Sequence, residues 1–251
     1  MRLLTLARDL GRRKAREKHS LFVAEGVRSV EELLRSGLKI EGALVAPQLA
    51  AAPRGQALRS ALEAARVDVL EVSEKDFRSA AETESPQGVI AIAAIPRGDL
   101  DALEVGPRCR ILVLDAVQDP GNVGTIVRTA AALGATGTIA LPGTVDLWNP
   151  KVIRSSMGAQ FAHPVFHAPV PELLSFLDRA RIELWCADAG GDPLNAESPP
   201  DRLAIALGNE GAGVSADVRS AARRTVSLPI ASTVESLNVA VAAGIILYHL
   251  R

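Results

Sequence analysis

Residues Leu112–Gly134, LVLDAVQDPGNVGTIVRTAAALG, are the stretch around which this chain is organised. The stretch begins with the apolar run Leu112–Leu114, which is typical of a buried parallel strand. Asp119–Asn122, DPGN, is typical of a turn. From Thr125 the apolar residues recur at helical spacing, and Gly134 is placed to end that helix. This order predicts a ligand site, because open α/β sheets bind ligands at the carboxyl ends of their strands.

Arg128 is the one charged residue of the predicted helix. An isolated arginine on a helix is usually a solvated surface residue. Here the polar loop lies about one helical turn away, so the arginine can act on whatever that loop holds. This position favours a functional role for Arg128.

The whole chain is typical of a globular protein of one or two domains. It has 251 residues, of which 48% are hydrophobic and 23% charged, with a formal net charge of −1. It shows neither an uninterrupted apolar run of membrane-spanning length nor a secretory signal at its start. Cys109 and Cys186 lie in or beside predicted strands, where free cysteine packs as a small hydrophobe. We therefore expect a cytoplasmic protein.

The pattern of apolar runs predicts a two-domain α/β protein. Residues 1–96 are expected to form a small β/α unit, 97–108 a linker, and 109–251 a second unit. Strands are predicted at 21–24, 43–46, 67–72, 88–95, 110–117, 138–141, 163–166, 183–187, 203–207 and 225–228. Helices are predicted at 27–36, 57–66, 125–133, 150–157, 171–180, 215–222 and 236–250, with a short helix capped by Ser73. In the second unit the alternation predicts a mostly parallel sheet covered on both faces.

The first 20 residues carry a basic cluster. They hold seven basic and two acidic residues, a local charge of +5. A solvated helix face is the plain interpretation, but clustering of one sign at a terminus more often meets phosphate. The candidate phosphate-binding residues are Arg12, Arg13, Lys14, Arg16 and Lys18.

Several common catalytic signatures are absent from the sequence. It has no Gly-rich phosphate loop ending in Lys-Ser/Thr and no GxGxxG after a strand. Neither Ser155 nor Ser156 lies in a GxSxG nucleophile motif. The four histidines show no metal-ligand spacing, so no metal is expected.

Three polar loops each follow a predicted strand. They are Asp119–Gly124, Leu207–Gly213 with the sequence LGNEGAG, and Leu228–Asn238 with the sequence LPIASTVESLN. Loops at the carboxyl ends of parallel strands meet at one edge of the sheet. The sequence therefore predicts a single small-molecule pocket formed by all three.

Structural roles compete with functional ones for the polar residues of these loops. Glu210 is an acid at a strand end, or a carboxylate that interacts with the start of the next helix. Ser236 and Asn238 stand at the beginning of the last helix, where capping is the plain role, although a cap needs only one of them. That last helix is apolar nearly all round, so we expect it to be buried.

The three loops, in this order and spacing, resemble the motifs of the SpoU (TrmH-type) family of RNA 2′-O-ribose methyltransferases, in the SPOUT superfamily. The motifs are DPGNVGTIVRTA, LGNEGAG and LPIASTVESLNVA, and the resemblance covers about residues 111–250. Residues 18–34, KHSLFVAEGVRSVEELL, resemble the ribosomal-protein-like substrate-binding domain often attached to this family. Leu133 and Ala240 depart from the family pattern, which often has an aromatic residue and a serine there.

The resemblance implies a fold, a methyl donor and an assembly. The C-terminal segment is expected to thread through a loop and form a deep trefoil knot, although knots are rare. S-adenosylmethionine is expected to bind in the knot. A homodimer is implied, in which Arg128 reaches the methyl donor of the partner subunit.

The resemblance also assigns roles to individual residues. The donor-binding positions are Leu207, Gly208, Leu228, Ile230 and Leu237. The catalytic constellation is Asn122, Arg128, Glu210, Ser236 and Asn238. Because a guanidinium stays protonated, we expect Arg128 to stabilise the developing alkoxide rather than to act as a base.

The expected activity is methyl transfer to a ribose 2′-OH of structured RNA, with 23S rRNA favoured. In that case the basic cluster of residues 1–20 contacts RNA. Alternatives are a tRNA ribose methyltransferase, a base methyltransferase and a non-catalytic RNA-binding protein that keeps the fold. Loss of Arg128 or Asn122 would indicate the last of these, and both residues are present.

Overall fold

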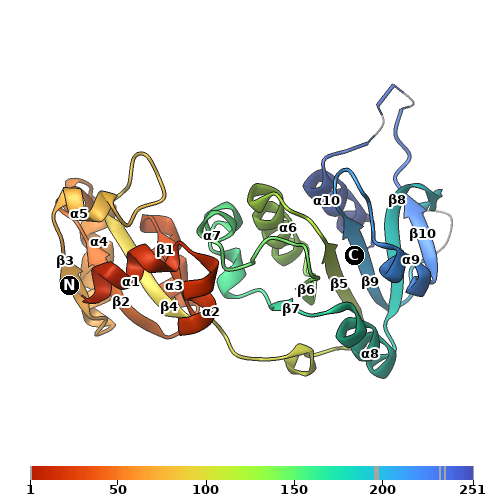
Figure 1. Cartoon of the computed structure of the whole chain (residues 1–251), viewed down its shortest axis with the longest axis horizontal. Helices are drawn as coiled ribbons and strands as arrows, with labels where there is room; N and C mark the ends of the chain where they lie inside the picture. The colour runs from red at the N-terminus through yellow and green to blue at the C-terminus, as the bar shows by residue number, and fades with distance from the viewer. Residues whose placement is uncertain (1, 195–197, 232, 235, 251) are drawn as a thin grey trace. The chain divides into compact units, whose positions relative to one another are not determined.

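The computed structural model describes residues 2–194, 198–231, 233–234 and 236–250, in two compact units (Figure 1). Unit 1 comprises Met1–Arg97 and Trp148–Ala162. Unit 2 comprises Gly98–Leu147 and His163–Arg251. The chain therefore passes from unit 2 into unit 1 and back again in the middle of its sequence.

Unit 1 is built on a four-stranded mixed sheet in the order β1-β4-β2-β3. β4 is antiparallel to β1 and β2, and β2 is parallel to β3. The strands are β1 (Leu21–Glu25), β2 (Ile40–Val45), β3 (Val69–Glu71) and β4 (Val89–Ala94). The helices are α1 (Arg2–Leu10), α2 (Arg13–His19), α3 (Val27–Arg35), α4 (Pro53–Ala64) and α5 (Glu74–Arg78), with a 3-10 turn, η1 (Pro47–Ala51). The four predicted strands and the three predicted helices of this unit are thus confirmed, with small shifts at their ends.

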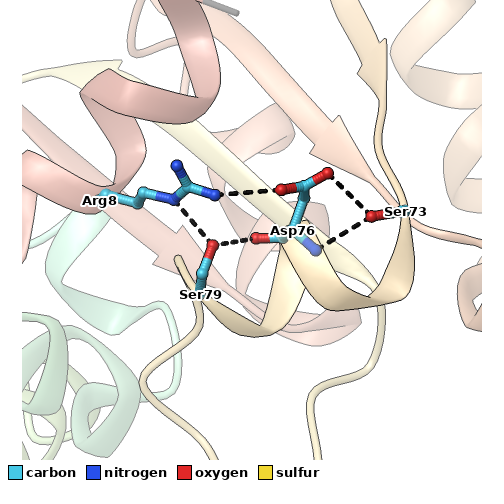
Figure 2. A network of polar contacts seen from close by, with 4 residues as sticks. All are labelled: Arg8, Ser73, Asp76 and Ser79. Carbon is cyan, nitrogen blue, oxygen red and sulfur yellow. Dashed lines mark hydrogen bonds and ion pairs between the residues drawn. The ribbon is translucent and has the colours of Figure 1, made fainter.

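The first 20 residues, for which no elements were predicted, form α1 and α2. The apolar side of α1, with Leu4 and Leu10, packs on Leu44, Phe77 and Ile92 in one core cluster. Polar contacts fix α1 to α5, as Figure 2 shows.

In this polar network, Arg8 Nε donates to Ser79 Oγ at 2.7 Å, and Arg8 Nη2 lies 3.2 Å from Asp76 Oδ1. Ser73 Oγ accepts from the Asp76 backbone N–H at 3.1 Å, which confirms Ser73 as the cap of α5. Arg8 is therefore occupied in holding two helices together.

Residues 148–162 pack within unit 1, although 109–251 was expected to be one unit. They contain α7 (Pro150–Ser156) and the 3-10 turn η3 (Ala159–Phe161). The Phe22 ring of β1 lies 4.7 Å from the Trp148 ring and 5.6 Å from the Phe161 ring. Gly158 lies so close to α3 that a Cβ there would be 2.5 Å from Glu32 Cβ. Burial of these aromatic rings explains why the segment leaves the unit expected from its sequence position.

Unit 2 contains a six-stranded sheet in the order β10-β8-β9-β5-β6-β7, and all of its pairings are parallel. This confirms the predicted parallel α/β architecture. The strands are β5 (Cys109–Asp115), β6 (Gly137–Ala140), β7 (Val165–His167), β8 (Glu183–Pro193), β9 (Arg202–Gly208) and β10 (Arg224–Ser227). The helices are α6 (Pro120–Ala132), α8 (Val170–Ala180), α9 (Ala216–Ala221) and α10 (Val239–Leu250), with a 3-10 turn, η2 (Leu100–Ala102).

The central strand β5 is buried at every position, as its apolar sequence predicts. Ile111 and Val113 face a core cluster that includes residues of α8 and α9. Leu112 and Leu114 alternate with them and point to the opposite face, where α6 and α10 pack together. Both cysteines are buried in the first of these cores, as expected.

Two predictions in unit 2 are wrong. The DPGN sequence is not a separate turn, because α6 begins at Pro120, and Asp119 caps it by accepting from the Asn122 N–H at 2.7 Å. Helix α10 is not buried all round. Val241, Ile245 and Tyr248 are 51%, 45% and 60% exposed, and their spacing places them on one side of the helix.

The strand order of unit 2 places β9 directly beside β5. From β5 the chain moves outward to β6 and β7, and then returns on the other side of β5 to form β8 and β9. The carboxyl ends of β5 and β9 are therefore neighbours at a topological switch point. This is where open α/β sheets bind ligands.

Candidate active site

A pocket of about 610 Å³ lies at the carboxyl ends of β9 and β10 and beside the middle of β8. Its wall combines strand ends with the two loops that follow β9 and β10. All five predicted donor-binding residues line it: Leu207, Gly208, Leu228, Ile230 and Leu237. Three predicted catalytic residues also line it: Glu210, Ser236 and Asn238. The structure thus brings two of the three predicted loops into one cavity.

The loop after β9 is a tight turn held by Asn209. The backbones of Asn209 and Gly213 exchange two hydrogen bonds, at 3.1 and 2.9 Å. Asn209 Oδ1 accepts from the N–H groups of Gly211 and Ala212, and Nδ2 donates to the Ala116 carbonyl. Asn209 therefore shapes the loop, and it was not singled out from the sequence. An asparagine that begins a Gly-rich turn is the signal that predicts such a role.

Gly208 is required by this turn. A Cβ at Gly208 would lie 2.1 Å from the carbonyl carbon of Gly213, closer than real Cβ atoms approach backbone. The sequence predicted that glycines here let backbone approach a ligand. In the structure, glycine is needed at position 208 because the backbone of Gly213 lies against it.

Glu210 lies at the tip of this turn and connects to the first predicted loop. Asn122 Nδ2 donates to Glu210 Oε1 at 2.7 Å. The alternative role of Glu210, at the start of the following helix, does not apply, because α9 begins only at Ala216.

Asn238 joins the third loop to the same network. Asn238 Nδ2 donates to Asn122 Oδ1 at 2.9 Å, and Asn238 Oδ1 accepts from the Ala240 N–H at 2.9 Å. Asn238 is therefore both a cap of α10 and a member of the network. Asn122 lies in the first turn of α6, so it links the two loops that line the pocket. Ser236 is exposed and lines the pocket.

Asp188 is a charged wall residue that sequence analysis missed. It lies in β8, lines the pocket, and its Oδ2 accepts from Arg219 Nη2 at 2.6 Å. The hydrogen bond from Arg219, together with one from the Gly190 N–H, lowers the pKa of Asp188. The pocket therefore presents an ionised carboxylate. The available signal was that Asp188 directly follows the strand predicted at 183–187.

Arg128 is placed differently from the other catalytic candidates. It is exposed on α6 and does not line the pocket. Within the described ranges it makes no hydrogen bond or ion pair. An unpaired guanidinium on an apolar helix is free to act on a bound partner or substrate.

The predicted RNA-binding residues of α1 and α2 fall into three groups. Arg16 is only 2% exposed and donates to the carbonyls of Leu10 and Gly11 at 2.8 Å, so its side chain is not free for phosphate. Two others are paired with neighbouring acids, Arg12 with Asp9 and Arg13 with Glu17. The remaining two are exposed and, among the residues described, unpaired: Lys14 and Lys18.

The described part of the chain holds neither a cluster of metal ligands nor a membrane-spanning helix. It contains no group of three or more His, Cys, Asp or Glu side chains that could hold a metal ion. None of its helices is long and apolar enough to cross a membrane.

Residues 110–248 match the SpoU rRNA Methylase family. The match includes the three loops and every member of the Asn122–Glu210–Asn238 network. The chain belongs to the SpoU family. Residues 5–91 of this SpoU chain match the MRM3-like substrate binding domain. The resemblance that the motifs indicated is therefore confirmed.

Relatives of this SpoU chain span nearly its whole length. It is 34% identical to the 23S rRNA (guanosine(2553)-2′-O)-methyltransferase RlmP of Bacillus subtilis, over 97% of this chain and 94% of that protein. It is 31% identical to the 23S rRNA (uridine(2479)-2′-O)-methyltransferase of Streptomyces viridochromogenes, over 96% of this chain and 85% of that protein. The crystal structure of the SpoU methyltransferase AviRb from Streptomyces viridochromogenes, in complex with the cofactor AdoMet, matches with a TM-score of 0.91 at 30% identity. That match covers 98% of this chain and 96% of the other.

Proposed function

We propose that this SpoU protein transfers the methyl group of S-adenosylmethionine to a ribose 2′-OH of 23S rRNA. The observation that carries the proposal is the Asn122–Glu210–Asn238 network, which joins the three family loops beside one pocket. The two relatives named above are both 23S rRNA 2′-O-methyltransferases and align over nearly the whole chain. This favours rRNA over tRNA and ribose over base.

The pocket suits S-adenosylmethionine in size and chemistry. Its volume of about 610 Å³ lies within the usual range for small-molecule sites. Ile230 and Val234 leave apolar surface exposed in its wall, which an adenine ring would cover. Asp188 and Glu210 supply negative charge suited to a cationic donor. AviRb, whose fold matches over nearly the entire chain, was crystallised with AdoMet.

The protein's own residues position the acceptor and manage its charge. When bound, S-adenosylmethionine supplies a methyl group on a sulfonium, which needs no further activation. The chain must then align the ribose 2′-oxygen and compensate the negative charge that develops on it as its proton leaves. Arg128 stabilises that charge and stays protonated throughout, with solvent or a phosphate oxygen taking the proton. The network of Asn122, Glu210 and Asn238 holds the loops in one arrangement.

The protein acts as a homodimer in this proposal, with Arg128 serving the donor pocket of the partner subunit. Two observations support it. Arg128 does not line the donor pocket of its own chain. In addition, Val241, Ile245 and Tyr248 form an exposed apolar stripe on α10, which packs against α6, the helix that carries Arg128. An apolar stripe of this kind is suited to burial against a second copy.

We also infer the trefoil knot of the SPOUT superfamily in unit 2. The support is the order of the last elements, because the chain leaves β10, passes through residues 228–238 and forms α10 against α6 and β9. Described residues of this loop, among them Leu228, Ile230 and Leu237, line the donor pocket, so the fold of the C-terminus and donor binding depend on each other.

A methylation assay tests the proposed function. The purified protein is incubated with methyl-labelled S-adenosylmethionine and 23S rRNA from a strain that lacks the corresponding gene. We expect label in one nucleotide that resists alkaline cleavage, because 2′-O-methylation removes the nucleophile that cleaves the chain. Label in a base, or in tRNA alone, would contradict the proposal. No label with folded, donor-binding protein would favour the non-catalytic alternative.

A further inference from the structure

Strand β8 carries a bulge where it borders the donor pocket. The pairing of β8 with β10 is interrupted between Thr225 and Val226, where residues 187–191 of β8 have no partner on β10. The base of this β8 bulge is closed by Ser227, whose Oγ donates to the Gly191 carbonyl at 2.8 Å. A Cβ at Gly191 would lie 2.6 Å from the carbonyl carbon of Thr225, so the two strands pack closely there. Bulges beside active sites commonly re-aim a side chain, and this one is held in a fixed shape.

Asp188 is the charged side chain that the β8 bulge brings to the pocket. It lines the pocket, and 28% of its side chain is exposed. Its Oδ1 accepts from the Gly190 N–H at 3.0 Å, and its Oδ2 accepts from Arg219 Nη2 at 2.6 Å. An ionised carboxylate can accept about four hydrogen bonds, so each oxygen keeps a further acceptor position. Asp188 is therefore fixed in orientation and still able to accept hydrogen bonds from a ligand.

The Asp188–Arg219 pair also lies against the turn that follows β9. A Cβ at Gly213 would be 3.5 Å from Asp188 Oδ2 and 3.6 Å from Arg219 Nη2, which are ordinary contact distances. Gly213 closes that turn through its two hydrogen bonds with Asn209, and it lines the pocket. Arg219 belongs to α9, and no residue of α9 lines the pocket. Arg219 is thus suited to hold Asp188 from outside the pocket, where the β8 bulge and the turn meet.

The ribose of the methyl donor is the group that best matches these acceptors. Because Arg219 offsets part of its charge, Asp188 chiefly offers acceptor atoms. The 2′- and 3′-hydroxyls of the ribose are two neutral O–H groups on neighbouring carbons, which one carboxylate can bind together. An acid near a strand end holds a ribose hydroxyl in this way in dinucleotide-binding α/β folds. The apolar wall for the adenine ring lies on another segment, at Ile230 and Val234, which leaves Asp188 for the sugar.

We propose that Asp188 binds the ribose hydroxyls of S-adenosylmethionine and that Arg219 is the positioning residue for this contact. The inference rests on the proposed function, because it takes S-adenosylmethionine as the methyl donor. It adds to that function the part of the methyl donor that is recognised and the pair of residues that recognises it. Selectivity for a ribose over a deoxyribose then resides in the β8 bulge, outside the three loops that the sequence indicated.

The first test compares S-adenosylhomocysteine with its 2′-deoxy analogue in calorimetry on the full-length protein. The wild type should bind the deoxy analogue about tenfold more weakly, the effect of one lost hydrogen bond to a charged acceptor. Asp188→Ala should bind the two ligands within about threefold of each other. Asp217→Ala, at an exposed acid of α9 outside the pocket, is the control and should keep the wild-type selectivity. Equal selectivity in Asp188→Ala and the wild type would overturn the proposal.

Asp188→Asn provides a second variant that keeps the size of the side chain if the β8 bulge does not form around alanine. Its amide oxygen is a neutral and weaker acceptor, so the selectivity should fall below that of the wild type. 5′-Methylthioadenosine then separates the ribose from the amino-acid end of the methyl donor, because it keeps the ribose and lacks the ammonium group. Asp188→Asn should weaken binding of 5′-methylthioadenosine and S-adenosylhomocysteine equally. A loss confined to S-adenosylhomocysteine would assign Asp188 to the ammonium group and overturn the proposal.

Arg219→Met tests the positioning role. The selectivity for S-adenosylhomocysteine over its deoxy analogue should fall, and Arg219→Lys should restore part of it, because lysine can still donate to Asp188. In the methylation assay Arg219→Met should raise the KM for the methyl donor and leave kcat near the wild-type value. Arg223→Met, at an exposed arginine next to α9, is the control and should match the wild type. A lower unfolding temperature with unchanged selectivity would show a structural role alone and overturn the role given to Arg219.

Failure of this inference is distinguishable from failure of the proposed function. If the wild type binds S-adenosylhomocysteine and methylates 23S rRNA but does not distinguish the deoxy analogue, only the ribose contact fails. If the folded wild type binds no S-adenosylhomocysteine, both fail.

Discussion

Arg128 is the residue whose surroundings give it no structural task. It is exposed and unpaired within the described ranges, on a helix whose other side is buried. Arg128→Ala should lower turnover by roughly 100-fold or more, the usual effect of losing one electrostatic stabiliser. Donor affinity, measured by calorimetry, should barely change. Arg128→Lys should rescue little, because lysine lacks the planar fork that can hold phosphate and 2′-oxygen together.

The control for Arg128 is Arg223→Ala, another exposed arginine of unit 2, which should retain wild-type turnover. Near-normal turnover in Arg128→Ala would remove the residue from the mechanism. A large loss of donor affinity in that variant would show that Arg128 helps to bind the donor, against the role in turnover proposed for it.

Gly208 and Gly211 provide a matched pair within one loop. Gly208→Ala would bring a Cβ to 2.1 Å from backbone, so the turn that carries Glu210 must move. A Cβ at Gly211 would make only an ordinary contact, at 3.6 Å from Asn209 Oδ1. We expect Gly208→Ala to lose S-adenosylmethionine binding by calorimetry, while Gly211→Ala binds within about threefold of the wild type. Equal affinities in the two variants would show that the turn does not shape the donor pocket.

Helix α10 shows at the scale of an element why one sequence pattern can have two causes. Its apolar residues on all sides predicted burial in the core, yet Val241, Ile245 and Tyr248 are exposed. An apolar helix sequence predicts that the helix surface is covered, but it does not tell whether the same chain or a second copy covers it. We expect Ile245→Arg to shift the protein from dimer to monomer in light scattering and to abolish turnover. A monomeric wild type would contradict the dimer proposal.

Mixed dimers test the shared site that α6 and α10 would form. Inactive Arg128→Ala subunits are combined with inactive Gly208→Ala subunits and the heterodimers are purified with two tags. One of the two sites then pairs an intact arginine with an intact donor pocket. Recovery of part of the wild-type activity is expected. No recovery in verified heterodimers would place arginine and donor on the same subunit.

The sequence predicted most elements of the fold because each carries its own local signal. The apolar runs of β5 and β9 and the cap at Ser73 are examples, and the structure confirms them. Local signals failed where one side chain suits two different local structures. Asp119 is typical of a turn, but in the structure it caps α6. Arg16 is typical of a surface cation, but its guanidinium donates to two backbone carbonyls. The pocket residue Asp188 was missed because its partner Arg219 is distant in sequence.

At the scale of the whole molecule, the segment Trp148–Ala162 ties the two units together through the chain itself. It packs within unit 1, but both of its ends continue directly into unit 2. There, the Leu147 N–H donates to His167 Nε2 at 3.2 Å, and His163 Nε2 lies 2.9 Å from Thr138 Oγ1. Cutting the chain after residue 97 therefore does not separate the two units, because part of unit 1 lies later in the sequence.

Deletion of residues 1–97 should destabilise the remaining chain for this reason. It would expose Trp148, Val152, Ile153 and Phe161, all buried in the intact protein, and burial of each large apolar side chain contributes about 1.5–3 kcal/mol. We expect aggregation or a lower unfolding temperature in scanning calorimetry.

A second deletion, in which a Gly/Ser linker also replaces residues 148–162, should be soluble, because it removes the exposed rings. Its donor affinity should stay within about threefold of the wild type, since every residue that lines the donor pocket belongs to unit 2. Its RNA affinity should be much lower and less dependent on salt, as the free cations of unit 1 are gone. Equal stability of the two deletions would show that unit 1 does not hold the segment, and full RNA affinity in the linker version would place the RNA-binding surface on unit 2.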